Sequence, residues 1–318
     1  MAARRRVQGL LAALTAGIVA AAASMEVEAN DSQAPESELL AVLRSDASPA
    51  DKAITCKRLA IVGSASSVPE LAKLLPDPQL SSWARIALEA IPGAASNAAL
   101  RDAVEQVEGR LLVGVINSLG VRRDVDAVKL LARRLNDPDP EVASAAAVAL
   151  GKIGNAVAAT SLSEALAGAA EESRSAVAEG LILCAEQLVS DDQAAAAVEI
   201  YDQVRTAEVP LQRVLEATRG AILARGPQGV PLLLEQLRSP DKKLLQIGLS
   251  TAREFPAGEV DEALAMEITR IAPERAALIL QAMADRNQAG VLPAVLSAAG
   301  SGPSQVRAAA IAAIGQIG

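Results

Sequence analysis

Two stretches of the sequence end in nearly the same way, at Gly154 and, 164 positions later, at Gly318. The first, "NDPDPEVASAAAVALGKIG", covers residues 136–154, and the second, "SGPSQVRAAAIAAIGQIG", covers residues 301–318. In the first, Asp139 can cap a helix that starts at Pro140, and Gly154 can stop it in the left-handed conformation. The residues between them recur at the spacing of one helix face: Val142, Ala146, Ala149, Leu150 and Ile153. The stretch therefore predicts a capped, amphipathic helix.

A second helix is expected just before this one, because apolar residues at 127, 130, 131 and 135 form another stripe ahead of the turn "NDPDP". A pair of such helices cannot bury both apolar faces alone, so successive pairs must stack. The closing turn of the unit recurs every 27–36 residues, at Gly63, Gly93, Gly120, Gly154, near Ser190, Gly226, Gly258, near Gln288 and at Gly318. Residues 36–318 thus predict an all-α fold, an α-solenoid of about nine HEAT- or armadillo-like helix pairs.

The repeated unit resembles a known family. "DPDPEVASAAAVALGKIG" is similar to the short HEAT repeat that is named after phycobilisome lyases. The runs "DKAITCKRLAIVGSASSVPELAKLL" and "GRLLVGVINSLGVRRDVDAV" are similar to exported bacterial HEAT-repeat proteins whose function is unassigned. The resemblance covers nearly all of residues 36–318. It implies an architecture and no single activity, because this repeat serves binding scaffolds, lyase subunits and hydroxylases alike.

Composition argues against several kinds of chemistry. The chain has no His, which removes the commonest general base and metal ligand. HEAT-type deoxyhypusine hydroxylase, which has similar repeats, holds iron through His-Glu pairs, so the resemblance does not extend to that activity. The sequence also lacks a P-loop, a G-x-S-x-G motif and a C-x-x-C motif, and nothing in it marks a bilin site. We expect no catalytic residue, no cofactor and no metal.

Charge and aromatic content argue against nucleic acid as a ligand. The formal net charge is −8, and Phe, Trp and Tyr occur once each in 318 residues. An acidic body repels phosphates, and three aromatic rings leave few platforms on which bases could stack. We therefore predict that the partner is another protein.

The first residues have the pattern of a secretory signal peptide. A basic start, "ARRR", is followed by an uncharged run from Val7 to Ala23 and by small residues suited to cleavage after Ala23 or Ala29. The alternative is an uncleaved anchor helix, although the run is a little short of the ~20 apolar residues that a span needs. We predict a signal peptide and short leader over 1–29, a linker over 30–35, export to the periplasm or cell envelope, and no membrane span after signal removal.

The two cysteines are expected to be free and mostly buried. Cys56 and Cys184 belong to the first and fifth units of the repeat, too far apart for the ~7 Å that a disulfide allows between Cα atoms. Lys57 and Arg58 beside Cys56 could lower the pKa of its thiol, but Thr55 and Leu59 place it on a buried stripe. A structural role is therefore the preferred interpretation of both cysteines.

Four residues are candidates for contact with a partner. Arg122 and Arg123 belong to the densest basic stretch, Gly120–Arg134, and could grip an acidic segment; the preferred alternative is that its basic residues pair with nearby Asp side chains. Trp83 either anchors a partner or, as preferred, fills a gap between repeats. Asn117 either lines a groove or caps a turn between repeats. We treat all four as candidate binding residues.

These features predict a non-catalytic protein-interaction scaffold of the cell envelope. One alternative is an accessory domain or subunit of an enzyme, either lyase-like or fused to a catalytic or haem domain outside this chain; another is a purely structural envelope component. Residues 301–318 offer few polar side chains beside their apolar stripe, which predicts an exposed apolar surface at this end. Such a surface predicts that the solenoid continues beyond residue 318 or, alternatively, that it forms a homodimer there.

Overall fold

The computed structural model describes residues 35–255, 258–286 and 289–317. Within these ranges the regular elements are α-helices and short 3-10 turns, with no strand, which confirms the predicted all-α fold. The predicted signal peptide and the predicted linker up to residue 34 lie outside the described residues. Contacts between helices divide the chain into unit 1, which ends at Asp124, and unit 2, which begins at Val125.

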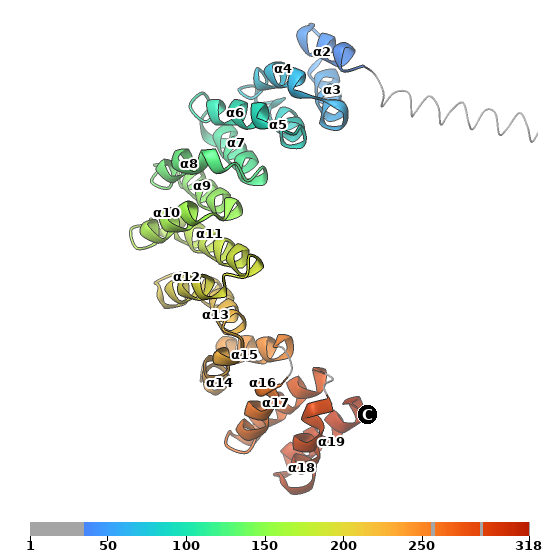
Figure 1. Cartoon of the computed structure of the whole chain (residues 1–318), viewed down its shortest axis with the longest axis vertical. Coiled ribbons are helices and arrows are strands. Elements are labelled where there is room, and N and C mark those ends of the chain that lie inside the picture. The colour runs from blue at the N-terminus through green and yellow to red at the C-terminus, as the bar shows by residue number, and fades with distance from the viewer. Residues whose placement is uncertain (1–34, 256–257, 287–288, 318) are drawn as a thin grey trace, which may run out of the picture. The chain divides into compact units, whose positions relative to one another are not determined.

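Unit 1 contains three helix pairs (Figure 1). The first helices of successive pairs contact one another, and so do the second helices, which gives two layers. Each helix buries one apolar stripe between the layers, as expected for stacked repeats. The first-helix layer holds α2 (Glu36–Arg44), α4 (Val68–Ala72) and α6 (Ala94–Ala103); the second-helix layer holds α3 (Pro49–Val62), α5 (Ser81–Ala90) and α7 (Gly109–Val121).

Unit 2 contains six further pairs, and its second helices contact one another in chain order from α9 to α19. The described residues therefore hold the nine pairs that the spacing of the turns predicts. The first helices are α8 (Val128–Arg134), α10 (Ala156–Leu166), α12 (Ala194–Thr206), α14 (Val230–Arg238), α16 (Glu259–Glu267) and α18 (Leu292–Ser301). The second helices are α9 (Pro140–Ile153), α11 (Glu171–Ser190), α13 (Leu211–Ala224), α15 (Lys242–Glu254), α17 (Pro273–Asp285) and α19 (Ser304–Ile317).

Helix α9 has the ends that its sequence predicts. The carboxylate of Asp139 accepts a hydrogen bond from the backbone N–H of Glu141 at 2.9 Å, and Pro140 is the first helical residue. Gly154 adopts a φ of 70° and stops the helix. The five predicted core positions are all buried. Local sequence thus determines where this helix starts, where it stops and which side faces inward.

The repeat keeps an unbroken register across five pairs. Helix α17 has the same length as α7 and begins 164 residues after it, and α19 stands in the same relation to α9. The distance between the two near-copies in the sequence is therefore five stacked helix pairs, as predicted. Equivalent positions in the two segments can be compared directly.

Helices α9 and α11 approach so closely that their backbones touch. A Cβ atom added to Gly151 would lie 2.6 Å from the Cα of Gly180, and a Cβ added to Gly180 would lie 2.5 Å from the carbonyl oxygen of Ala147. Interiors are packed to the density of organic crystals, so neither helix can retreat without opening a void elsewhere. Small residues at these positions set the distance between the two pairs.

A carboxylate at the end of α17 links three second helices. Asp285 accepts hydrogen bonds from Arg253 on α15 at 2.6 Å, from Gln281 on its own helix at 2.9 Å and from Gln316 on α19 at 3.0 Å. These hydrogen bonds, that of Gln316 foremost, lower the pKa of Asp285 to about 2. The ionised carboxylate thus joins α15, α17 and α19.

This pKa gives a pH-dependent contribution to stability. A carboxyl whose pKa is lower in the folded than in the unfolded state stabilises the fold above its unfolded pKa, and the contribution is lost as pH falls from about 4 through about 2. Asp285→Asn should therefore lower the free energy of unfolding at pH 7, by about 1 kcal/mol for a partly exposed group, and should make a much smaller difference at pH 2, where about half of the folded carboxyl is protonated. Urea unfolding of both proteins at the two pH values measures this. An equal deficit at both values would contradict it.

Candidate functional site

The side chain of Arg122 caps the preceding helix pair. It follows α7 and reaches back to the end of α5, where its terminal nitrogens donate hydrogen bonds of 2.7–2.9 Å to the backbone carbonyls of Leu88, Glu89, Ile91 and Gly93. Its Nε donates to the side-chain oxygen of Asn97. The last carbonyls of a helix have no partner within the helix, so the guanidinium supplies what α5 lacks. Burial lowers the pKa of Arg122.

The donors of Arg122 are already used inside the fold, which favours a structural role over the predicted role as a grip for a partner. The same arrangement recurs five pairs later, where Arg286 follows α17 and donates to the carbonyls of Ala252 and Phe255 at 2.5 and 2.6 Å and to Asp261 at 2.9 Å. Every residue of the second arrangement lies 164 positions after its counterpart in the first. Because the arrangement recurs at equivalent positions of the repeat, we infer that it stabilises the contact between successive helix pairs.

The other residues of the predicted basic stretch have different surroundings. Arg123 is exposed in the turn after α7 with a φ of 50°, an uncommon conformation for a residue other than glycine. In unit 2, Arg134 pairs with Asp137 at 3.2 Å, in line with the preferred interpretation, while Lys129 and Arg133 are exposed. The basic residues of the stretch are thus divided between the end of unit 1 and the start of unit 2.

Trp83 lies on the outer surface of the second-helix layer of unit 1. It is 38% exposed, so part of its side chain is open to a partner. On the same helix Ile86 is 46% exposed, and on the adjoining α3 Ile54 and Ile61 are 52% and 74% exposed. We call these four residues the α3–α5 face. The remaining predicted residue, Asn117, is half-buried on α7.

Sequence reasoning missed Ile54, Ile61 and Ile86. The sequence of α3 contains a signal for two of them, because this helix has more apolar residues than its one buried stripe requires. Cys56 and Leu59 fill that stripe at 0% exposure, while Ile54 and Ile61 recur at a spacing of seven on another side. A second apolar stripe on a helix with a complete core stripe indicates a contact surface.

A polar network joins α5 to α7. The guanidinium of Arg85 donates to the carbonyl oxygen of Gly114 at 3.1 Å and to the hydroxyl of Ser118 at 3.3 Å, and Ser118 donates to Glu89 at 2.6 Å. A Cβ on Gly114 would lie 2.7 Å from the Nε of Arg85, so glycine makes room for the arginine. Burial lowers the pKa of Arg85. The network links α5, the helix that carries Trp83 and Ile86, to α7.

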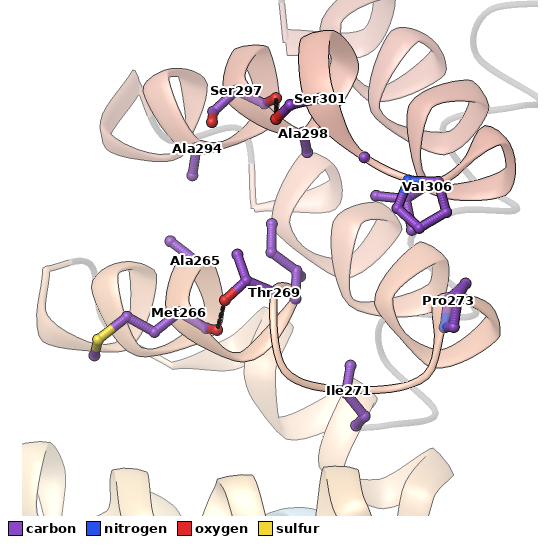
Figure 2. Close-up of a pocket in the computed structure, with 13 residues that line it drawn as sticks. Ala265, Met266, Thr269, Ile271, Pro273, Ala294, Ser297, Ala298, Ser301 and Val306 are labelled. Carbon is purple, nitrogen blue, oxygen red and sulfur yellow. Dashed lines mark hydrogen bonds between the residues drawn. The ribbon is translucent and has the colours of Figure 1, made fainter.

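Unit 2 has an open cleft of about 530 Å³ bordered by α16 and α18 (Figure 2). Its two hydrogen-bonded hydroxyls are engaged within their own helices, since Thr269 donates to the carbonyl of Met266 and Ser301 to that of Ser297. The residues that line the cleft include no titratable side chain: Ala265, Met266, Ile268, Thr269, Ile271, Pro273, Ala294, Ser297, Ala298, Ser301, Gly302, Pro303 and Val306. The lining offers neither an acid nor a base for catalysis.

The two cysteines are free and buried, as predicted. Cys56 and Cys184 are both 0% exposed. Burial raises the pKa of Cys56 to about 11 and that of Cys184 to about 12. The thiolate is the reactive form, so both cysteines are poor nucleophiles and serve as small core residues.

Thiol labelling should confirm this. At pH 8 a thiol with a pKa near 11 is ionised to about one part in 1,000, and burial also blocks access. Iodoacetamide should therefore modify neither cysteine of the folded protein, and both should react at least about 100-fold faster in guanidinium chloride. Mass spectrometry of peptides identifies the modified residue. Rapid labelling of folded Cys56 would show that Lys57 and Arg58 activate it after all.

Two further properties concern the described residues only. No group of three or more potential ligand side chains among them is placed so that it could hold a metal ion. None of their helices combines the length and the apolar character that crossing a membrane requires.

Comparison with known proteins supports the architecture. The HEAT repeats family matches residues 108–182. A comparison with curated protein sequences gave no match. Among solved structures, Kap95p in its structure with RanGDP is 13% identical with a TM-score of 0.53, covering 89% of this chain and 45% of its own.

Two structures of enzymes are also similar to this chain. Human deoxyhypusine hydroxylase is 20% identical with a TM-score of 0.38, over 80% of this chain and 96% of its own. The CpcE–CpcF complex of phycocyanin lyase from Nostoc sp. PCC7120 is 19% identical with a TM-score of 0.41, over 79% and 93%. Sequence identities this low are evidence for a similar fold alone. The chain is an α-solenoid of HEAT-type helix pairs.

Proposed function

We propose that this chain is a non-catalytic scaffold that binds another protein through the α3–α5 face. The observation that carries the proposal is the exposure of Trp83, Ile86, Ile54 and Ile61 on two helices in contact. Single exposed apolar residues are common on protein surfaces, but a cluster around a tryptophan is characteristic of binding sites. The Arg85 network holds the face in place before a partner arrives, which reduces the entropy lost on binding.

Two features support a non-catalytic role. The pKa values of the thiols, the strongest nucleophiles in the sequence, are raised by burial. The cleft of unit 2 is lined by apolar and hydroxyl-bearing residues without a titratable group. Stacked repeats in turn provide a broad surface, which suits binding better than a reaction that needs a water-excluding pocket.

Site-specific cross-linking tests the proposed surface. A photoreactive phenylalanine analogue at Ile86 should capture one distinct protein in cells of the source organism, and the product should disappear when Trp83→Ser is added. The matched control carries the analogue at Gln106, which is exposed just beyond α6 in the other layer. The same products from both sites would contradict the proposal. Capture of an enzyme would favour an accessory role within an enzyme complex.

We also propose that the chain acts after export to the periplasm or cell envelope. The basic start and the uncharged run from Val7 to Ala23 support this. Intact-mass analysis of the protein from the envelope fraction should show the loss of 23–29 residues, which corresponds to cleavage after Ala23 or Ala29. Finding the full-length chain in the cytosol would contradict this proposal.

A second proposed contact is a homodimer through α19. Ile311 on α19 is 62% exposed, and its equivalent on α9, Ala147, is covered by α11. The face of α19 thus has the small-residue pattern that receives a helix elsewhere in the same chain. In sedimentation velocity runs we expect a dimer that Ile311→Asp abolishes and that Leu296→Asp on α18 leaves intact. A monomer at every concentration would contradict it.

A further inference from the structure

The second helices of unit 1 carry an excess of positive charge, although the whole chain has a net charge of −8. Helices α3, α5 and α7 hold five basic and two acidic residues. The basic residues are Lys52, Lys57, Arg58, Arg85 and Arg110, and the acidic residues are Asp51 and Glu89. This positive layer is the layer that bears the α3–α5 face.

Hydrogen bonds within the fold already engage both acidic residues. Asp51 accepts from the hydroxyl of Ser48 at 2.7 Å at the start of α3, and Glu89 accepts from Ser118 at 2.6 Å. The salt bridges described in unit 1 join Arg44 and Lys73 to Glu70 and Arg101 to Asp124, and so involve neither carboxylate. Both carboxylates keep their charge, but the five basic residues outnumber them, so a ligand that approaches these helices meets more positive than negative side chains.

Lys57 connects the charge to the apolar face. It is exposed on α3, three residues after Ile54 and four before Ile61, so it lies one helical turn from each. An ammonium group in this position adjoins the two most exposed apolar residues of the α3–α5 face. A partner that covers Ile54 and Ile61 must place its own groups against Lys57.

We propose that the occupant of the α3–α5 face is an acidic amphipathic segment of a partner protein. Its apolar side chains cover Trp83, Ile86, Ile54 and Ile61, and its Asp or Glu side chains face the exposed Lys57. This inference rests on the proposed function and adds the chemistry of the partner. A basic segment is disfavoured, because it would bring a like charge against Lys57.

The only tryptophan of the chain lies on this face, so intrinsic fluorescence reports on it directly. The probe is a synthetic amphipathic helix of about 18 residues with Leu on one face and Glu on the other. One control peptide has Lys in place of Glu, and the other has Ser in place of Leu. The first probe should shift the emission of Trp83 to shorter wavelength in a saturable way, and added salt should weaken its binding. Neither control peptide should do so.

Two charge reversals separate local contact from net charge. Lys57→Glu should weaken binding of the acidic probe by at least about tenfold, because it sets like charges against each other. Lys152→Glu on α9, an exposed site in unit 2, makes the same change in net charge and should have little effect. An equal effect of both variants would overturn the inference.

Other outcomes would also overturn it. Tighter binding of the Lys peptide, or of an oligothymidine, would assign the face to a basic segment or to nucleic acid. If cross-linking at Ile86 captures a partner while the acidic probe leaves Trp83 fluorescence unchanged, the chain is a scaffold and the acidic class is wrong. If neither experiment detects binding, the proposed function itself fails.

Discussion

Arg286→Ala is expected to destabilise unit 2 by about 3–5 kcal/mol, because it leaves a buried carboxylate without its counter-charge. The side chains of Arg286 and Asp261 are 2% and 8% exposed, and their charged atoms are 2.9 Å apart. The substitution also removes the donors for the carbonyls of Ala252 and Phe255. Urea unfolding followed by circular dichroism measures the loss.

Three comparisons make this result specific. Arg286→Lys should restore little, because one ammonium cannot donate in the directions of a guanidinium. Arg133→Ala, at an exposed site in the same unit, should change stability by less than about 0.5 kcal/mol. A double variant with Arg286→Met and Asp261→Leu should be more stable than Arg286→Ala, since no charge stays buried. If Arg286→Ala has wild-type stability, the arginine does not tie the repeats together.

Gly180→Ala should cost about 2–3 kcal/mol, although alanine is the better helix former. The new methyl group would lie 2.5 Å from the carbonyl oxygen of Ala147 and 3.1 Å from a methyl carbon of Leu162. The first neighbour is backbone, so α9 and α11 would have to move apart. Hydrogen exchange at the amides of these two helices, together with urea unfolding, locates and measures the effect.

Gly300→Ala is the matched control for Gly180→Ala. Gly300 lies in α18, and an added Cβ would have no neighbour within 4 Å. This substitution should stabilise the protein by up to about 1 kcal/mol through helix propensity alone. If the two substitutions change the free energy of unfolding in opposite directions, the destabilisation by Gly180→Ala results from the contact between α9 and α11 and from no general property of glycine. Equal stability of Gly180→Ala and wild type would mean that α9 and α11 can separate freely.

The Arg122 arrangement shows why sequence reasoning could not identify the hydrogen-bond partners of a candidate binding residue. In the sequence Arg122 belongs to a basic stretch, which predicts an exposed, charged side chain. Its actual partners at the end of α5 are 29–34 residues away. The acceptors that lie near a side chain depend on how one helix pair stacks on the next. The spacing of residues along the chain does not predict these contacts.

The exposure of Trp83 could not be predicted from the sequence for a related reason. Its sequence neighbours are those of a core helix, and a tryptophan among alanines resembles a filler. Whether it is buried depends on its angle around α5, which the contacts of Arg85 with α7 help to set. The α3–α5 face needed the additional fact that α3 lies against α5, because its four exposed residues belong to these two helices.

The sequence by itself determined the helices, their capped ends and the number of pairs. Asp139, Pro140 and Gly154 act through hydrogen bonds and dihedral angles that span a few residues, and the apolar period directly encodes the inward side. Tertiary structure alone decided which polar groups serve the fold and which apolar groups face a partner. Arg122, Arg286 and Gly180 acquire their roles from atoms brought close by stacking. The physical reason is that hydrogen bonding and burial depend on distance in space, whereas helix formation depends on distance along the chain.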